Sequence, residues 1–221
     1  MIGWLKKQYF QLRIKWLLAF KPDVLFDKIN RLNWYKNTLR QWVDEQNFSI
    51  KSKVLEVGCA SGTLTAHIAK SGCIPTGVDF SSNMIELAKI NNSNIDFAVA
   101  NVLELPFAAE FFDVVIAASL LNIVSNKTKA MDELTRTCKK GGVVTILVPA
   151  AEFNDENLLA LQTSLGSSGF SGAAMDAWHK RAPKMNANDI AYLFKQAGLT
   201  EMTTKNYLQG MVISVSAIKP F

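Results

Sequence analysis

An acidic residue and two glycines lie close together early in the chain. The segment reads Lys53-Val-Leu-Glu-Val-Gly-Cys-Ala-Ser-Gly-Thr-Leu64, in which an apolar run gives way to Glu56, Gly58 and Gly62. Glycine has no Cβ, so its backbone can take unusual dihedral angles and a ligand can lie against the main chain. Unpaired N–H groups at the start of a following helix would face the same place. The pattern predicts a buried strand that turns into a helix around a small-molecule ligand.

The glycine spacing separates two ligand classes. A dinucleotide fingerprint, G-x-G-x-x-G, counted from Gly58 would need glycines where Ala60 and Thr63 stand. Ala60 is small enough to substitute, whereas Thr63 is not easily accommodated. The observed spacing is E-x-G-x-x-x-G. A dinucleotide-dependent oxidoreductase stays open as an alternative that a nicotinamide-shift assay would test, and so does a turn that binds no ligand.

A second acidic residue follows the glycine loop. The segment from Ile74 to Phe80 predicts a strand that ends at Asp79, about twenty residues after the loop, which is the separation used by nucleotide-binding folds. A carboxylate there can accept hydrogen bonds from both hydroxyls of a ribose. Ser81 supplies a hydroxyl cap for the helix that should follow.

These motifs resemble those of the class I S-adenosylmethionine-dependent methyltransferases. E-x-G-x-x-x-G is similar to the family's first motif, and V-D-F-S-S-N-M-I-E-L-A to its second. K-G-G-x-V-x-I-x-V-P, which ends at Pro149, again resembles the family. Ala60 stands where the family more often has a third glycine. The resemblance is specific over roughly residues 53–148.

The resemblance implies S-adenosylmethionine as cofactor. Glu56 and the glycine loop would hold its methionine tail. Asn101 replaces the acid that accepts from the adenine amino group in the family motif G-D-A-x-x-L-P-F, and its amide oxygen can accept the same bond. The predicted cofactor-binding residues are Glu56, Gly58, Cys59, Ala60, Ser61, Gly62, Asp79, Phe80, Met84, Asn101, Val102, Leu103 and Ser119. Most follow the ends of successive predicted strands, where ligands of parallel sheets bind.

Strands alternating with helices predict an α/β fold. We expect a Rossmann-like, doubly wound, mostly parallel seven-stranded sheet with helices on both faces and a closing antiparallel pair typical of this class. The length of 221 residues favours a single domain. Its predicted parts are an N-terminal helical cap (1–48), a cofactor-binding core (49–150), a lid-like insertion (151–185) and a last helix with closing strands (186–221).

The predicted boundaries follow from apolar periodicity and turn residues. Helices are expected over 1–20, 24–46, 63–70, 81–89, 129–139, 154–165 and 184–197. Strands are expected over 53–57, 74–80, 95–99, 112–119, 143–148, 199–205 and 211–218. Residues 140–142 should form a turn and 166–172 a flexible loop. His67 is expected to be an ordinary residue on a helix face.

The first helix carries an apolar stripe flanked by basic residues. The stripe consists of Leu5, Tyr9, Leu12, Trp16 and Phe20, and the flanking residues are Lys6, Lys7, Arg13 and Lys15. We expect the stripe to pack against the core as a cap over the acceptor pocket. A plain packing element is an alternative, as is an interfacial anchor, because Trp and basic residues suit a membrane surface.

Methyl transfer is an in-line displacement, so the protein mainly aligns the acceptor and excludes water. A general base is needed only when the acceptor must lose a proton early. His179 and Tyr35 are weak candidates for that base, and each is favoured more as a packing residue or part of the pocket wall. The predicted substrate-facing residues are Tyr9, Tyr35, Asn122, Trp178 and His179. The aromatic residues of the covering segments indicate a small lipophilic or lipid-like acceptor. Quinone and phospholipid N-methyltransferases share this core, and nothing in the sequence chooses between them.

The net charge and the spacing of the cysteines bear on whether the protein binds nucleic acid or a metal. The net charge of +5 is only mildly basic and gives no strong nucleic-acid signal, although an RNA methyltransferase with a basic groove stays open. A non-catalytic adenosylmethionine-binding protein also stays open. The three cysteines lack C-x-x-C spacing, so no metal site is indicated. With charges interrupting the first apolar segment, neither a secretory signal nor a spanning helix is expected. We therefore expect a cytoplasmic protein, with peripheral membrane contact through the first helix as an alternative.

Overall fold

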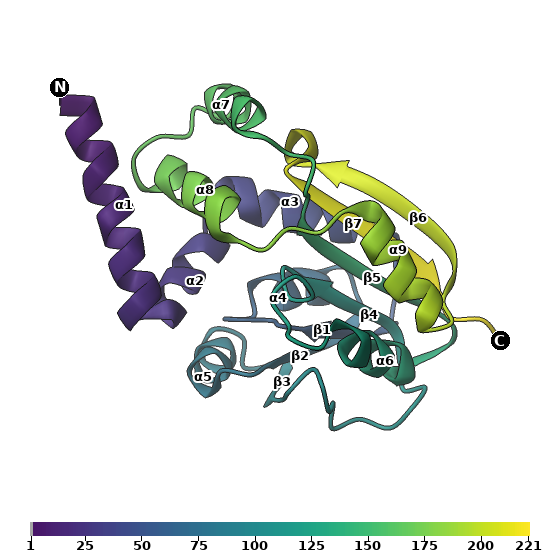
Figure 1. Ribbon diagram of the computed structural model, residues 1–221. Helices are drawn as coiled ribbons and strands as arrows, with labels where there is room; N and C mark the ends of the chain where they lie inside the picture. The colour runs from purple at the N-terminus through teal and green to yellow at the C-terminus, as the bar shows by residue number, and fades with distance from the viewer. Residues whose placement is uncertain (1) are drawn as a thin grey trace.

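The computed structural model describes residues 2–221, with side chains from residue 8 onward. Its centre is a seven-stranded sheet of order β3-β2-β1-β4-β5-β7-β6 (Figure 1). The strands are β1 (Lys53–Val57), β2 (Ile74–Asp79), β3 (Asp96–Val99), β4 (Phe112–Ala118), β5 (Cys138–Pro149), β6 (Thr200–Tyr207) and β7 (Val212–Ile218). Strands β1 to β5 pair in parallel, and β7 runs antiparallel to both β5 and β6. The predicted fold class is confirmed.

Helices surround this sheet. They are α1 (Ile2–Phe20), α2 (Pro22–Asn30), α3 (Asn33–Asp44), α4 (Thr63–Lys70), α5 (Ser82–Asn91), α6 (Lys127–Thr137), α7 (Asp155–Ser164), α8 (Gly169–Arg181) and α9 (Ala187–Gln196), with a short 3₁₀ turn at Leu208–Gly210. Neighbouring residues on a strand point to opposite faces. Leu55 accordingly packs in the core that includes α6 and α9, whereas Val54 packs in the one that includes α3 and α4. Two apolar layers thereby fix the C-terminal ends of the central strands.

The largest differences between the predicted boundaries and the structure occur at three places. The helix expected over 24–46 is two helices, because Leu32 is extended and begins α3 anew. Strand β5 starts at Cys138, where helix and turn were expected, because Cys138 pairs with Phe112 and the backbone of Gly141 donates to Lys219. Helix α8 begins at Gly169 inside the expected loop. In the second and third cases, tertiary pairing or packing overrides a local turn signal.

Helix α1 forms as predicted but buries a different face. Ile14 and Leu17 are buried in a cluster with Leu25 of α2 and with Ala173 and Ala174 of α8. The small side chains of α8 let the two helices approach closely, which spacing within α1 alone does not reveal.

The predicted stripe lies on the outside of α1. Tyr9, Leu12, Trp16 and Phe20 are 57%, 62%, 51% and 71% exposed, so the prediction that they pack against the core is wrong. The side chain of Leu5 lies outside the described residues. Within residues 2–221, no helix has the length and apolar character needed to cross a bilayer.

Candidate active site

The turn after β1 depends on left-handed backbone conformations. Gly58, Ala60 and Gly62 have φ of 81°, 46° and 77°. A Cβ on Gly62 would lie 2.7 Å from the ring of Phe97, so this position has no room for a side chain. Ala60 pays a steric cost for the left-handed conformation that a glycine would avoid. The chain therefore turns tightly from β1 into α4, whose first N–H groups follow the loop.

Glu56, the last but one residue of β1, is a buried carboxyl group. It is 3% exposed and accepts a hydrogen bond from the hydroxyl of Thr65 on α4. Burial raises the pKa of Glu56 to about 8, and the negative charge of nearby Asp79 adds to the rise. In the protein alone this carboxyl group is therefore largely protonated at neutral pH.

A small cavity, partly open to solvent, lies beside Glu56. Residues of α3 and α4 form its walls together with the end of β1 and the start of the glycine loop. Its lining comprises Asn30, Tyr35, Lys36, Leu39, Arg40, Glu56, Gly58, Cys59, Thr63, Leu64 and Ala118. The cavity thus unites three predicted cofactor-binding residues with Tyr35.

Arg40 lines the cavity, although it is not among the residues predicted from the sequence. Its Nε is buried without a hydrogen-bond partner, and such a group is costly unless a ligand satisfies it. Arg40 and Glu56 line the same cavity, so it offers a cation and a buried carboxyl group. These groups complement the carboxylate and the ammonium of an α-amino acid. No local motif marks Arg40, because only the packing of α3 over β1 brings it there.

Asp79 joins the glycine loop to the turn after β2. Its Oδ2 accepts from the backbone N–H of Ala60 and its Oδ1 from that of Ser81, each at 2.9 Å. Each oxygen keeps a second lone pair for a ligand hydroxyl. Next to it, the ring of Phe80 is 78% exposed. An open aromatic face therefore lies beside an acceptor suited to ribose.

Asn101 follows β3 in an exposed turn. Its Oδ1 accepts from the backbone N–H of Leu103 at 3.0 Å, so the amide stabilises its own turn. Leu103 is half-buried, and Val102 belongs to the core. Met84 on α5 is likewise buried. The segment therefore exposes Asn101 and part of Leu103, while Val102 anchors it.

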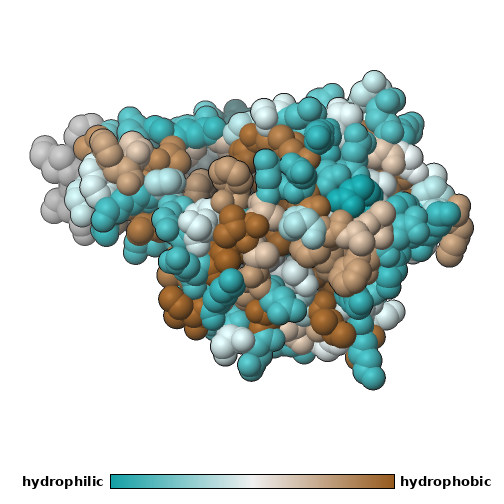
Figure 2. All heavy atoms as spheres, turned by 90° about the horizontal axis from the view of Figure 1, so that it is seen from below, coloured by the Kyte–Doolittle hydropathy of each residue, from teal (hydrophilic) through white to brown (hydrophobic). Residues whose placement is uncertain are grey.

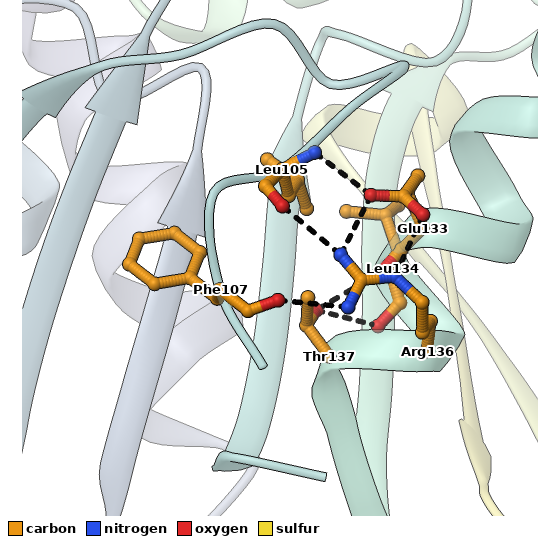
Figure 3. Close-up of polar contacts among 6 residues, drawn as sticks. All are labelled: Leu105, Phe107, Glu133, Leu134, Arg136 and Thr137. Atoms are coloured by element: carbon orange, nitrogen blue, oxygen red, sulfur yellow. Dashed lines mark hydrogen bonds and ion pairs between the residues drawn. The ribbon is translucent and has the colours of Figure 1, made fainter. Parts of the chain in front are cut away.

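Two residues of α6 hold the continuation of this segment. Arg136 donates to the carbonyl oxygens of Leu105 and Phe107 at 3.0 and 2.8 Å, and Glu133 accepts from the backbone N–H of Leu105 at 2.7 Å (Figure 3). Glu133 also pairs with Arg136 at 2.7 Å, and this hydrogen bond lowers the pKa of Glu133. The segment that presents Asn101 is therefore fixed to the sheet's helical layer. No sequence pattern marks these roles, because the partners are about thirty residues apart.

Helix α2 bridges both loops of the site. Asp27 accepts from the hydroxyl of Ser61 at 2.7 Å. One helical turn earlier, Asp23 accepts from the hydroxyl of Ser81 at 3.2 Å and from the amide of Asn83 at 2.9 Å. The cap over this edge of the sheet is thus made by α2 and α3, whereas none of the described residues of α1 line the cavity.

Tyr35 closes the cavity from α3. Its hydroxyl donates to Ser119 at the end of β4, at 3.0 Å. Its ring packs edge-on against Trp34 and Trp178, with centroids 5.7 and 5.2 Å away. Burial raises the pKa of Tyr35 to about 12, so the phenol is a hydrogen-bond donor at neutral pH rather than a base. Ser119, whose φ is 52°, is held against the aromatic cluster.

Other predicted residues lie away from this cavity. Tyr9 is on the outer side of α1, and His179 is buried beside Phe153 with its Nε2 3.0 Å from Asp155. Asn122 is buried and donates to the carbonyl of Pro183 at 3.1 Å. Tyr9 and His179, two of the predicted substrate-facing residues, do not line this cavity. Tertiary packing directs both side chains elsewhere.

Comparison with known proteins finds methyltransferases. Residues 55–146 match the model of a methyltransferase domain. Over 92% of its length the chain is 29% identical to a demethylmenaquinone methyltransferase of Paenarthrobacter aurescens (strain TC1), of which it covers 83%. Over 70% of its length it is 30% identical to a tRNA (carboxymethyluridine(34)-5-O)-methyltransferase of Arabidopsis thaliana, of which it covers 38%.

A solved structure shows the same fold. Phosphoethanolamine N-methyltransferase 2 of Haemonchus contortus, in complex with S-adenosyl-L-methionine, matches with a TM-score of 0.68 at 15% identity. The match covers 94% of this chain and 60% of that one. The methyltransferase domain over residues 55–146, the methyltransferase relatives and the shared fold together support a class I S-adenosylmethionine-dependent methyltransferase, as the motifs predicted. Within that class it is similar to the quinone methyltransferases.

Proposed function

We propose that this methyltransferase binds S-adenosylmethionine at the strand ends and methylates a small, lipophilic acceptor beneath the aromatic cluster of Trp34, Tyr35 and Trp178. The observation that carries the proposal is the cavity that Arg40, Glu56 and Tyr35 line together. One part of that cavity suits a charged amino-acid moiety, and its aromatic cover suits an apolar ring.

The residues present fit this cofactor. Arg40 would bind the carboxylate of the methionine part, satisfying its buried Nε, and Glu56 would bind the ammonium. Binding a cation beside Glu56 favours the carboxylate, so we expect Glu56 to release its proton when the cofactor binds. Asp79 would accept from the ribose hydroxyls. The exposed ring of Phe80 and the amide of Asn101 would contact the adenine.

S-adenosylmethionine supplies a methyl group already activated by a sulfonium charge. The chain's own contribution is to hold the acceptor in line and to keep water out. The hydroxyl of Ser119 accepts from Tyr35, which leaves its own hydrogen free to orient a polar atom of the acceptor. Tyr35 stays protonated and Glu56 faces the cofactor, so neither would act as a base. The acceptor's proton would pass to solvent, before methyl transfer if the acceptor is acidic and after it otherwise.

An acceptor with a quinol-type ring accounts best for this arrangement. A quinol ring can stack on aromatic side chains, whether the methyl group goes to a phenolic oxygen or to a ring carbon. Its hydroxyl groups ionise more readily than an aliphatic alcohol does. The similarity to a demethylmenaquinone methyltransferase supports the same class. The match to a tRNA methyltransferase keeps RNA as the competing acceptor, although it spans only 38% of that protein.

Transfer of labelled methyl groups tests the proposal. The purified protein would be incubated with methyl-labelled S-adenosylmethionine and, separately, with isoprenoid-substituted quinols, phosphoethanolamine and total tRNA. We expect label in the quinols. Label in tRNA alone would overturn the acceptor class.

Two arginine variants test whether the cavity binds the cofactor. Arg40→Met should weaken cofactor binding at least tenfold, because a charge-assisted hydrogen bond is worth roughly 1.5–3 kcal/mol. Arg181→Met removes an exposed arginine at the end of α8 and serves as the matched control. Equal cofactor affinities for the two variants would place the methionine tail elsewhere.

A further inference from the structure

The outer face of α1 is an apolar surface without a partner among the described residues. Tyr9, Leu12, Trp16 and Phe20 recur at three- and four-residue steps and are each more than half exposed. The rings of Trp16 and Phe20 lie 5.9 Å apart. In Figure 1 α1 stands at the edge of the molecule, and Figure 2 shows tan and brown atoms among teal ones on the arm that it forms at the left. Soluble monomers seldom keep such a surface uncovered.

The opposite face of α1 fixes this surface in place. Ile14 and Leu17 are 3% and 5% exposed in the cluster shared with α2 and α8. The amide of Gln11 donates to Asp176 of α8 at 3.1 Å. The helix is therefore held by one side, and its outer residues are presented on a rigid support. Binding through them carries little further cost of ordering.

The charges beside this face are all positive. The 19 residues of α1 include three lysines and one arginine but no aspartate or glutamate. Arg13 and Lys15 are exposed on either side of the apolar residues, and Lys21 follows at the end of the helix. Two copies of the chain meeting through this face would bring like charges together. An anionic surface, in contrast, complements both the apolar face and the charges on either side of it.

We propose that the outer face of α1 binds the surface of an anionic phospholipid bilayer. The helix would lie in the interface, with Leu12, Trp16 and Phe20 at the level of the headgroups and upper acyl chains. Arg13, Lys15 and Lys21 would face the phosphate groups. The helix is not of the kind that crosses a bilayer, which agrees with binding parallel to the surface. The inference does not depend on the identity of the methyl acceptor.

Vesicle binding tests the apolar part of this proposal. The full chain, without cofactor or acceptor, would be sedimented with phosphatidylcholine vesicles that contain phosphatidylglycerol and with phosphatidylcholine alone. A variant combining Leu12→Gln, Trp16→Gln and Phe20→Gln should have an affinity for the anionic vesicles that is at least roughly tenfold lower. The matched control combines Ile90→Gln, Leu159→Gln and Tyr192→Gln, which are as exposed but lie on other helices. It should bind like the unmodified chain.

A charge variant tests the electrostatic part. Arg13→Gln with Lys15→Gln should weaken binding to the anionic vesicles roughly tenfold or more, since each basic residue near such a surface contributes about fivefold. Lys89→Gln with Lys195→Gln is its control. Unchanged binding of the apolar variant would overturn the proposal.

Light scattering separates the competing occupant. If the unmodified chain is a dimer, the apolar variant is a monomer and neither protein binds vesicles, the face is an interface between copies instead. Failure of the methyl-transfer assay would leave the vesicle result unaffected, so the two proposals are tested separately.

Discussion

The carboxylate of Asp79 accepts a 2.9 Å hydrogen bond from the backbone N–H of Ala60. The acid at the end of β2 thereby fixes the left-handed residue in the loop after β1. A residue proposed to bind ribose also shapes the loop proposed to hold the methionine part.

Replacing Asp79 should therefore affect both parts of the cofactor site. Asp79→Ala is expected to weaken S-adenosylmethionine binding by on the order of 2 kcal/mol, because ribose loses its charged acceptor and the loop loses a support. Calorimetry measures the affinity, and circular dichroism checks that the variant is folded. Asp96→Ala, an exposed acid on β3, is the control. Full affinity in a folded Asp79→Ala protein would exclude the ribose assignment.

The raised pKa of Glu56 predicts how stability depends on pH. In the unfolded chain the carboxyl group ionises near its ordinary pKa of 4.5, but in the folded protein only near 8. Between these values the folded state binds the extra proton, so the free energy of unfolding falls as pH rises. The expected slope is about 1.4 kcal/mol per pH unit. Urea unfolding of the cofactor-free protein measures it.

Two variants isolate the contribution of Glu56. Glu56→Gln should remove this slope, whereas Glu104→Gln, which changes an exposed acid, should keep it. Identical pH profiles for Glu56→Gln and the unmodified protein would mean that Glu56 is ionised in the folded state. Cofactor binding near neutral pH should also release a proton, which calorimetry in buffers of different ionisation enthalpy detects.

The backbone of the glycine loop predicts opposite effects of two small substitutions. Ala60→Gly should stabilise the protein by about 0.5–1 kcal/mol, because relief of left-handed strain exceeds the added entropy of the unfolded chain. Gly62→Ala should destabilise it by more than about 1 kcal/mol, since its Cβ would meet the ring of Phe97. Denaturant midpoints compare the two. A destabilised Ala60→Gly protein would show that Ala60 carries no strain.

The contacts of Arg136 predict a local effect. Arg136→Met should leave two carbonyl oxygens of the 101–107 segment without their donor and cost about 1–2 kcal/mol of stability. Arg136→Lys should recover only part of it, because an ammonium cannot reproduce the forked geometry of the guanidinium. Amide hydrogen exchange should speed up chiefly in residues 101–107. A uniform increase throughout the chain would argue against a specific support of this segment.

The core of this protein can be predicted from its amino-acid order. The alternation of apolar strands and helices after Lys53, together with the acids and glycines at the strand ends, is local information. Buried parallel strands read as apolar runs, and left-handed turns select glycine, so both survive in the order of residues. The fold, the family and the positions of Glu56 and Asp79 at strand ends followed from these patterns.

The elements that cover the site depend on packing between distant parts of the chain. Arg40, Asp27 and Arg136 belong to helices whose sequences carry no motif, and their partners are distant in the chain. Spacing alone does not distinguish which apolar face of α1 is buried, the one with Ile14 and Leu17 or the one with Trp16. Close packing against the alanines of α8 buried Ile14 and Leu17 and left Trp16 exposed, because the shape of a neighbouring helix is not encoded in the periodicity of α1 itself.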